Sequence, residues 1–164
     1  MHVRPVAAVA LSLTLGLSLS ACGSGEDAAT SRITQVTDGV DGSVTTYGND
    51  LKVSSLLLVA QPDGSAVLVG SIVNKTSRED VLLGIAAKGV LATLSQKTLP
   101  LRPDQPLLFS GDQANAAAVF SGIKAAIGTR VKVKLFFGIA GELTLDAMVR
   151  EKSGIYAKVS TPAI

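Results

Sequence analysis

Two stretches near the C-terminal end of the chain alternate regularly between apolar and polar residues. In residues 130–137 every second position is apolar and most positions between are basic, and residues 142–150 repeat the alternation with mixed polar residues. Successive side chains of a β-strand point to opposite faces, so this period of two predicts two half-buried strands. We expect one face of each strand to be buried: Val131, Val133, Leu135 and Phe137 in the first, and Leu143, Leu145, Ala147 and Val149 in the second.

These two strands are close enough in sequence to form a hairpin. Pairing Phe137 with Leu143 matches their apolar faces and leaves a three-residue loop that ends at Gly141. The last residue of such a loop adopts the left-handed conformation, which glycine reaches without strain. The same register places Lys134 opposite Asp146 on the solvent face.

Three other runs, residues 53–60, 66–73 and 81–87, are apolar on both faces, which is typical of strands covered on both sides. Turn-forming residues separate the strands, as in Asp41-Gly42, Gly48-Asn49-Asp50 and Pro62-Asp63-Gly64. This spacing, without a sustained period of 3.6, predicts an all-β fold: an antiparallel β-sandwich of immunoglobulin-like type over residues 33–164. Alanines near residues 114–120 also fit one helical turn, but we expect strand from Ala117 onward.

The N-terminal segment follows a different pattern. A short start containing Arg4 precedes Val6–Leu19, which carries no charge and is shorter than the roughly 20 residues that span a bilayer as a helix. Small residues follow directly. Residues 1–21 are therefore predicted to be a signal peptide that is removed from the mature protein.

The end of this segment resembles a bacterial lipobox, in which a cysteine becomes acylated: Leu19, Ser20, Ala21 and Cys22. Cys22 is the only cysteine of the chain, and acylation explains an otherwise unpaired thiol in an exported protein. We expect a lipid on Cys22 that holds the protein on the extracytoplasmic face of the cell membrane. Residues 22–32 are small and polar, and they are predicted to form the lipid-bearing N-terminus and a flexible tether.

Charge and composition exclude several functions. The chain has 15 Lys and Arg against 13 Asp and Glu, and Arg4 and the only histidine, His2, belong to the predicted signal peptide. The mature protein is therefore nearly neutral, which argues against nucleic acid as a partner. Met148 is its only methionine, and it lacks histidine and tryptophan.

No catalytic arrangement is recognisable, so we expect the protein not to be an enzyme. A histidine base is missing, and the G-x-S-x-G motif does not occur. Glu142 and Asp146 share one strand face, but we expect them to pair with surface lysines. The turn residues Asp38, Asp41 and Asp50 lack the spacing of a calcium loop.

Two further features have ordinary interpretations. Asn74-Lys75-Thr76 fits the glycosylation motif, which carries little weight in a bacterial lipoprotein. Phe109, Phe120 and Phe137 are expected in the core. Phe136 falls on the polar face of its strand, where an exposed phenylalanine indicates a contact surface.

Several motifs together resemble the PCu(A)C-type periplasmic copper chaperones. The stretches VGSIVNK (residues 69–75) and EDVLLGIAA (79–87) are similar to a strand, Asn-containing turn and following strand of that family, and residues 99–111 occupy the place of a proline-bearing connection. Gly122-Ile123-Lys124, Gly128–Val131 and Phe137–Glu142 are similar to three motifs of its C-terminal half. The likeness covers about residues 66–150 and implies a cupredoxin-like β-sandwich. Small actinobacterial lipoproteins built on this domain look closer still, including Ile33-Thr34-Gln35.

The resemblance fails where that family binds copper. Its His-x-Met ligand pair corresponds to Ala117-Ala118-Val119 here, and its earlier histidine falls near residues 91–94, which hold no ligand. Cu(I) selects thioether and imidazole ligands, so we expect neither a metal site nor any other cofactor.

Three interpretations of function remain open. The first is a non-catalytic module of the cell envelope that binds a protein partner or stabilises an assembly. The second is a carrier of a lipid or other apolar ligand, which a cavity of several hundred Å³ between the sheets would support. The third is an accessory role in metal handling, through carboxylates or a second protein.

Overall fold

The computed structural model describes residues 38–162, and strands form most of its regular structure. The strands are β1 (Val40–Val44), β2 (Leu51–Ala60), β3 (Ala66–Asn74), β4 (Asp80–Ala87), β5 (Val90–Leu91), β6 (Thr93–Leu94), β7 (Leu99–Leu101), β8 (Leu107–Leu108), β9 (Ala118–Phe120), β10 (Arg130–Phe137) and β11 (Glu142–Glu151). Two single 3-10 turns, η2 (Thr46–Gly48) and η3 (Gly154–Tyr156), interrupt them. The predicted all-β fold is confirmed, and β9 begins one residue after the expected Ala117.

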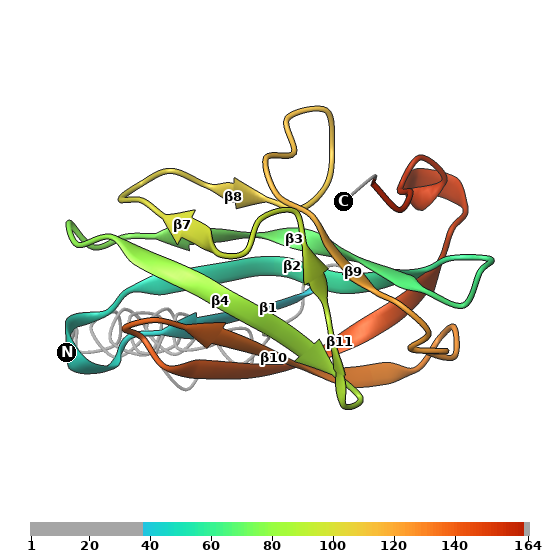
Figure 1. Ribbon diagram of the computed structural model, residues 1–164, viewed down its shortest axis with the longest axis horizontal. Coiled ribbons are helices and arrows are strands. Elements are labelled where there is room, and N and C mark those ends of the chain that lie inside the picture. Colours follow the sequence, from blue (N-terminus) through green and yellow to red (C-terminus); the bar gives the residue numbers. More distant parts are fainter. Residues whose placement is uncertain (1–37, 163–164) are drawn as a thin grey trace, which may run out of the picture. The chain divides into compact units, whose positions relative to one another are not determined.

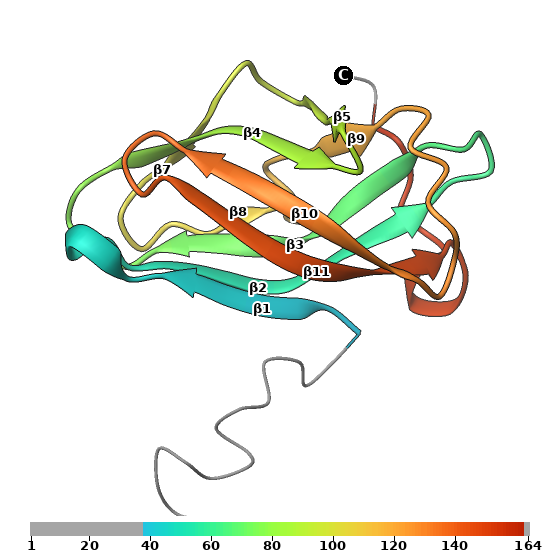
Figure 2. The same cartoon turned by 90° about the horizontal axis from the view of Figure 1, so that it is seen from below.

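Hydrogen bonds link the strands in the order β5-β4-β10-β11-β2-β3-β9-β6, with β1 on β2, β7 on β4 and β8 on β3. The sheet curls, so that the layer containing β4 and β10 faces the layer containing β2 and β3 (Figures 1 and 2). One pairing departs from the antiparallel expectation. The end of β11 runs parallel to β2, with Met148 beside Leu57, and this junction joins the two layers.

The core lies between these layers. Residues with no exposed surface come from both sides, among them Leu56, Leu58, Leu68, Leu82, Ile85, Val133 and Leu135. Phe109, Phe120 and Phe137 are buried as predicted. Phe136 is half-buried, because its ring lies over Gly84 of β4, where a Cβ would come within 4.0 Å of the ring.

The β10–β11 hairpin confirms the predicted faces but corrects the register. Phe136 pairs with Glu142 and Lys132 pairs with Asp146, two residues away from the expected alignment. Phe137 donates its N–H to the carbonyl of Gly141 at 2.7 Å, which makes residues 138–140 the loop. Gly141 has the expected positive φ, +84°. A shift of two residues leaves every side chain on its original face, so the hydrophobic pattern does not distinguish the two registers.

The neighbouring strand β4 contacts the loop of the hairpin. The carboxylate of Asp80, at the start of β4, accepts hydrogen bonds from the N–H groups of Ile139 and Ala140 at 2.9 and 3.0 Å. Gly138 also donates its N–H to the carbonyl of Val81 at 2.9 Å. These bonds anchor the loop to β4 in the observed register.

The predicted signal peptide, lipobox and tether lie outside the described residues, as does the predicted start of the domain at residue 33. Within residues 38–162, no helix is long and apolar enough to cross a membrane.

Candidate functional site

The pairing of β6 with β9 brings together the two segments that the family resemblance singles out. Thr93 pairs with Val119, and Leu94 pairs with Ala118. Next to them, Ser95 donates its N–H to the carbonyl of Ala117 at 3.0 Å, and its hydroxyl accepts the N–H of Ala117 at 3.1 Å. Residues more than twenty positions apart in the sequence therefore form one short ladder.

The side chains on this ladder are not metal ligands. Ala118 and Val119 are buried, Ala92 before β6 is buried too, and Leu91 is 67% exposed. Met148 is the only methionine of the described residues, and it lies on β11 between Arg130 and Leu57. Residues 38–162 contain no cluster of three or more His, Cys, Asp or Glu side chains suited to a metal. Aliphatic side chains offer no donor to Cu(I), so this ladder does not fit the ion.

A groove of about 460 Å³ lies beside the same ladder. It is formed by β3, the segment after β8 and the C-terminal segment that includes η3, and its apolar lining includes Val67, Val69, Phe109, Ala116, Ala117 and Val159. Asp112 and Lys158 also line it. The predicted apolar cavity was expected between the sheets; this groove instead lies over residues of β3 that face away from the core.

Tyr156 of η3 ties the C-terminal segment to the first described residue. Its hydroxyl donates to a carboxylate oxygen of Asp38 at 3.3 Å, and Arg150 lies 3.2 Å from the same oxygen. Burial raises the pKa of Tyr156 above its ordinary value, and the charge of Asp38 acts in the same direction. The phenol therefore stays protonated and remains a donor at neutral pH.

The carboxylates considered as a catalytic pair point to lysines instead. Asp146 lies 3.4 Å from the ammonium group of Lys132, and Glu142 lies 3.7 Å from that of Lys134. All four side chains are at least half exposed. The expectation of surface pairing is confirmed, with partners set by the corrected register.

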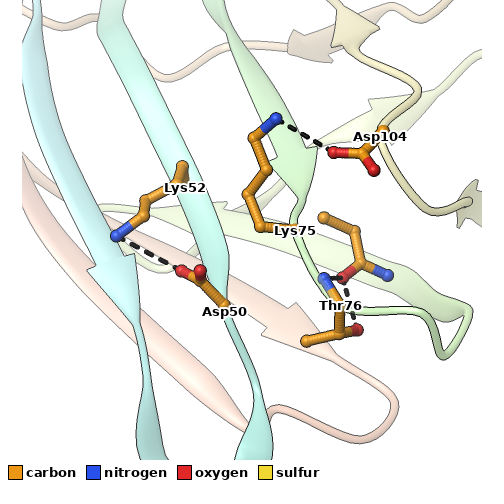
Figure 3. A network of polar contacts seen from close by, with 6 residues as sticks. Asp50, Lys52, Lys75, Thr76 and Asp104 are labelled. Atoms are coloured by element: carbon orange, nitrogen blue, oxygen red, sulfur yellow. Dashed lines mark hydrogen bonds and ion pairs between the residues drawn. The ribbon is translucent and has the colours of Figure 1, made fainter.

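A polar network at the C-terminal end of β3, the end away from the groove, was not predicted from the sequence. Asn74 is 1% exposed and donates its side-chain N–H groups to the carbonyls of Arg78 and Leu101 at 2.7 and 2.9 Å. Its carbonyl oxygen accepts from the N–H and hydroxyl of Thr76 at 3.0 and 2.7 Å (Figure 3). The only signal in the sequence was an asparagine that ends an apolar run. We call the loops around Asn74 (residues 45–50, 75–79, 102–105 and 138–141) the Asn74 end.

No protein-family model and no curated protein sequence match the chain. Solved structures do: the copper-bound PCuAC domain from PmoF2 matches with a TM-score of 0.58 and 22% identity, over 68% of this chain and 97% of that one. The domain therefore has the fold of a PCuAC domain. The apo PCuAC domain from PmoF1 matches with a TM-score of 0.56 and 22% identity, over 68% of this chain and 98% of the other. The apo PmoF2 PCuAC domain matches with a TM-score of 0.54 and 21% identity, over 63% of this chain and 92% of the other.

The likeness confirms the resemblance seen in the sequence at the level of the fold. It also covers nearly the whole of each PCuAC domain, so the core of that fold is present here rather than a fragment of it.

Proposed function

We propose that the protein is a cell-envelope lipoprotein, anchored to the membrane through Cys22, in which a PCuAC-like domain acts as a non-catalytic binding or scaffold module without a metal site. The observation that carries this proposal is the β6–β9 ladder. Both segments that bear ligands in the resembled family meet there, yet they present Thr93, Leu94, Ala117 and Val119.

Copper binding tests the loss of the metal site. The chain should carry Cys22→Ser, because a free thiol is itself a Cu(I) ligand. We expect this protein to lose Cu(I) to a competing chelator that buffers the free ion in the nanomolar range. A matched variant with Thr93→His, Ala117→His and Val119→Met restores imidazole and thioether groups on the ladder and serves as the positive comparison. Stoichiometric copper retained by the Cys22→Ser chain alone would restore a role in copper transport.

Membrane anchoring has its own test. Several acyl chains, each methylene contributing about 0.8 kcal/mol on burial, hold a lipoprotein firmly. We expect Cys22→Ser to move the protein to the soluble fraction or to leave an uncleaved precursor. Processing and membrane retention identical to those of the unmodified chain would rule out lipidation at Cys22.

A surface for a protein partner is available on the outer face of β4, β5 and β10. Leu91 and the half-buried Phe136 lie over Gly84, and Leu83 nearby is 50% exposed. A photo-crosslinking residue at position 91 should capture a defined partner in cells, and one at Lys52, on β2, should not. Equal capture at both positions would show that this surface is not the binding site of the partner.

The groove beside Ala117 supports a second candidate function, the carriage of one acyl chain. Its volume of about 460 Å³ lies within the range of small-molecule sites, and its floor is apolar. A fluorescent fatty acid should bind with 1:1 stoichiometry, and Val67→Asp, which places a charge on that floor, should abolish the binding. Binding unchanged by Val67→Asp would exclude the groove.

A further inference from the structure

Basic side chains gather around a concave surface at the end of the domain where β4 ends and β10 begins. The concavity has a volume of about 410 Å³. It is lined by four basic residues, Lys88, Lys124, Arg130 and Lys132, together with Ala126, Thr129 and Val131. No carboxylate is among the described residues that line it. We call this end, with the turns at residues 61–65, 88–89 and 122–129, the Arg130 end.

Two of the four cations have no partner among the described residues. Lys132 lies 3.4 Å from Asp146, and Arg130 donates to the carbonyl of Asp146 at 3.3 Å. The ammonium groups of Lys88 and Lys124 make no ion pair or hydrogen bond within residues 38–162. Both residues sit in tight turns at positive φ, +49° and +45°, and both are exposed.

Exposed apolar side chains lie at the same end. Ile127, in the turn before β10, is 58% exposed, and Ile155, in η3, is 84% exposed. Both line a second concave surface together with Asp38 and Tyr156. A cationic surface flanked by projecting aliphatic side chains matches the chemistry of an anionic bilayer surface, whose headgroups attract lysine and whose acyl boundary accepts isoleucine.

The path of the chain supports the same orientation. Asp38, the first described residue, is held by Arg150 and Tyr156 at this end. β1 starts from there, beside β11 and near η3 (Figure 2). Asp38, the described residue nearest to Cys22 in the sequence, therefore lies at the same end of the domain as the cationic surface.

We propose that the Arg130 end faces the membrane and binds anionic lipid headgroups through Lys88, Lys124, Arg130 and Lys132, with Ile127 and Ile155 entering the interface. The orientation rests on the proposed anchor at Cys22, but the electrostatic contact is measurable without it. Each basic residue near an anionic surface contributes about fivefold to binding, so the contact adds to the anchor and fixes how the domain is presented.

The test uses residues 22–164 with Cys22→Ser, a segment that contains every residue of the core. We expect it to co-sediment with vesicles of phosphatidylglycerol and phosphatidylcholine but not with pure phosphatidylcholine, and to be released as salt rises. The variant Lys88→Asn/Lys124→Asn removes two charges and suits the positive φ at both positions. It should bind about 25-fold more weakly. Ile155→Ser should weaken binding by a smaller factor.

The matched control is Lys52→Gln/Lys75→Gln, which removes two charges at the Asn74 end, where these lysines pair with Asp50 and Asp104. It should change vesicle binding by less than about threefold. Equal losses of binding in the two double variants would show that only the net charge of the protein matters. Equal binding to both kinds of vesicle would show that anionic headgroups do not contribute. Either result overturns the proposal. Vesicle binding is measured separately from the cell fractionation of Cys22→Ser. The proposed lipid anchor and the proposed membrane-facing surface can therefore be disproved independently.

Discussion

The two ends of the sandwich hold their loops by different means. At the Asn74 end, buried polar side chains bind the backbone of distant loops: Asn74 binds the carbonyls of Arg78 and Leu101, and Asp80 binds two N–H groups of the β10–β11 loop. The same end also carries surface ion pairs such as Lys75–Asp104, 3.0 Å apart (Figure 3).

At the Arg130 end, turns close mainly through backbone geometry. Gly122, Lys124 and Gly128 take positive φ, and bonds such as that from the N–H of Lys124 to the carbonyl of Gly64, at 3.1 Å, join neighbouring turns. Its cations are largely left to solvent. The comparison indicates that buried polar groups stabilise one end, whereas the other end leaves its charged groups available for an external partner.

The largest effect should come from Asn74→Ala. Removing the side chain leaves two carbonyls without their donors in a buried place, and we expect a loss of about 3 kcal/mol in the free energy of unfolding, measured by urea melts. Asn115→Ala is the matched control, because Asn115 also joins two backbone groups, the carbonyl of Pro106 and the N–H of Leu108, but is exposed. A smaller loss for Asn74→Ala than for Asn115→Ala would contradict this account of the Asn74 end.

Asp80→Asn should have the next largest effect. The carboxylate accepts from three N–H groups, whereas an amide turns one donor toward them, so we expect a loss of about 2 kcal/mol. Amide hydrogen exchange should accelerate at Ile139 and Ala140. Asp41→Asn, which alters an exposed contact with the N–H of Ser55, should leave that exchange unchanged. Unaltered exchange in Asp80→Asn would mean that the loop is held by other contacts.

Gly141→Val tests the hairpin turn itself. A Cβ at this position meets no atom within 4 Å, so the cost is backbone strain alone, roughly 1–2 kcal/mol. Val133→Ala, at a position with no exposed surface, should cost about 2 kcal/mol, whereas Lys132→Ala on the solvent face should stay within about 0.5 kcal/mol. Urea melts of the three variants compare them, and a neutral Gly141→Val together with a damaging Lys132→Ala would invert the assigned faces.

The smallest effect concerns Asp63, in a turn of the Arg130 end. The hydroxyl of Ser65 and then its N–H hold the pKa of Asp63 below its ordinary value. A lowered pKa means that the folded state favours the ionised form; the resulting stabilisation is present above the pKa of the unfolded chain and is lost as pH falls through the folded value. NMR titration should show the pKa of Asp63 rising toward 3.8 in Ser65→Ala. An unchanged pKa in Ser65→Ala would show that the hydrogen bonds from Ser65 do not cause the lowered pKa of Asp63.

The hydrophobic pattern was sufficient for the local features. Alternation assigned the faces of β10 and β11, and the continuous apolar run predicted β3 as a strand covered on both sides. Gly141 could be placed at positive φ from the turn alone. The sequence also holds no histidine after His2 and no cysteine after Cys22, so the expectation that copper does not bind at the family position follows from residue types alone.

Only the tertiary structure decided how these elements meet. In the observed hairpin register, Asp80 binds the β10–β11 loop from nearly sixty residues away, and a pattern of period two does not distinguish registers that differ by two residues. The β6–β9 ladder, the burial of Asn74 and the grouping of Lys88 with Lys124 and Arg130 likewise join distant segments. Side-chain alternation is a property of each strand, whereas hydrogen-bond satisfaction and charge grouping arise only when separate strands share one fold.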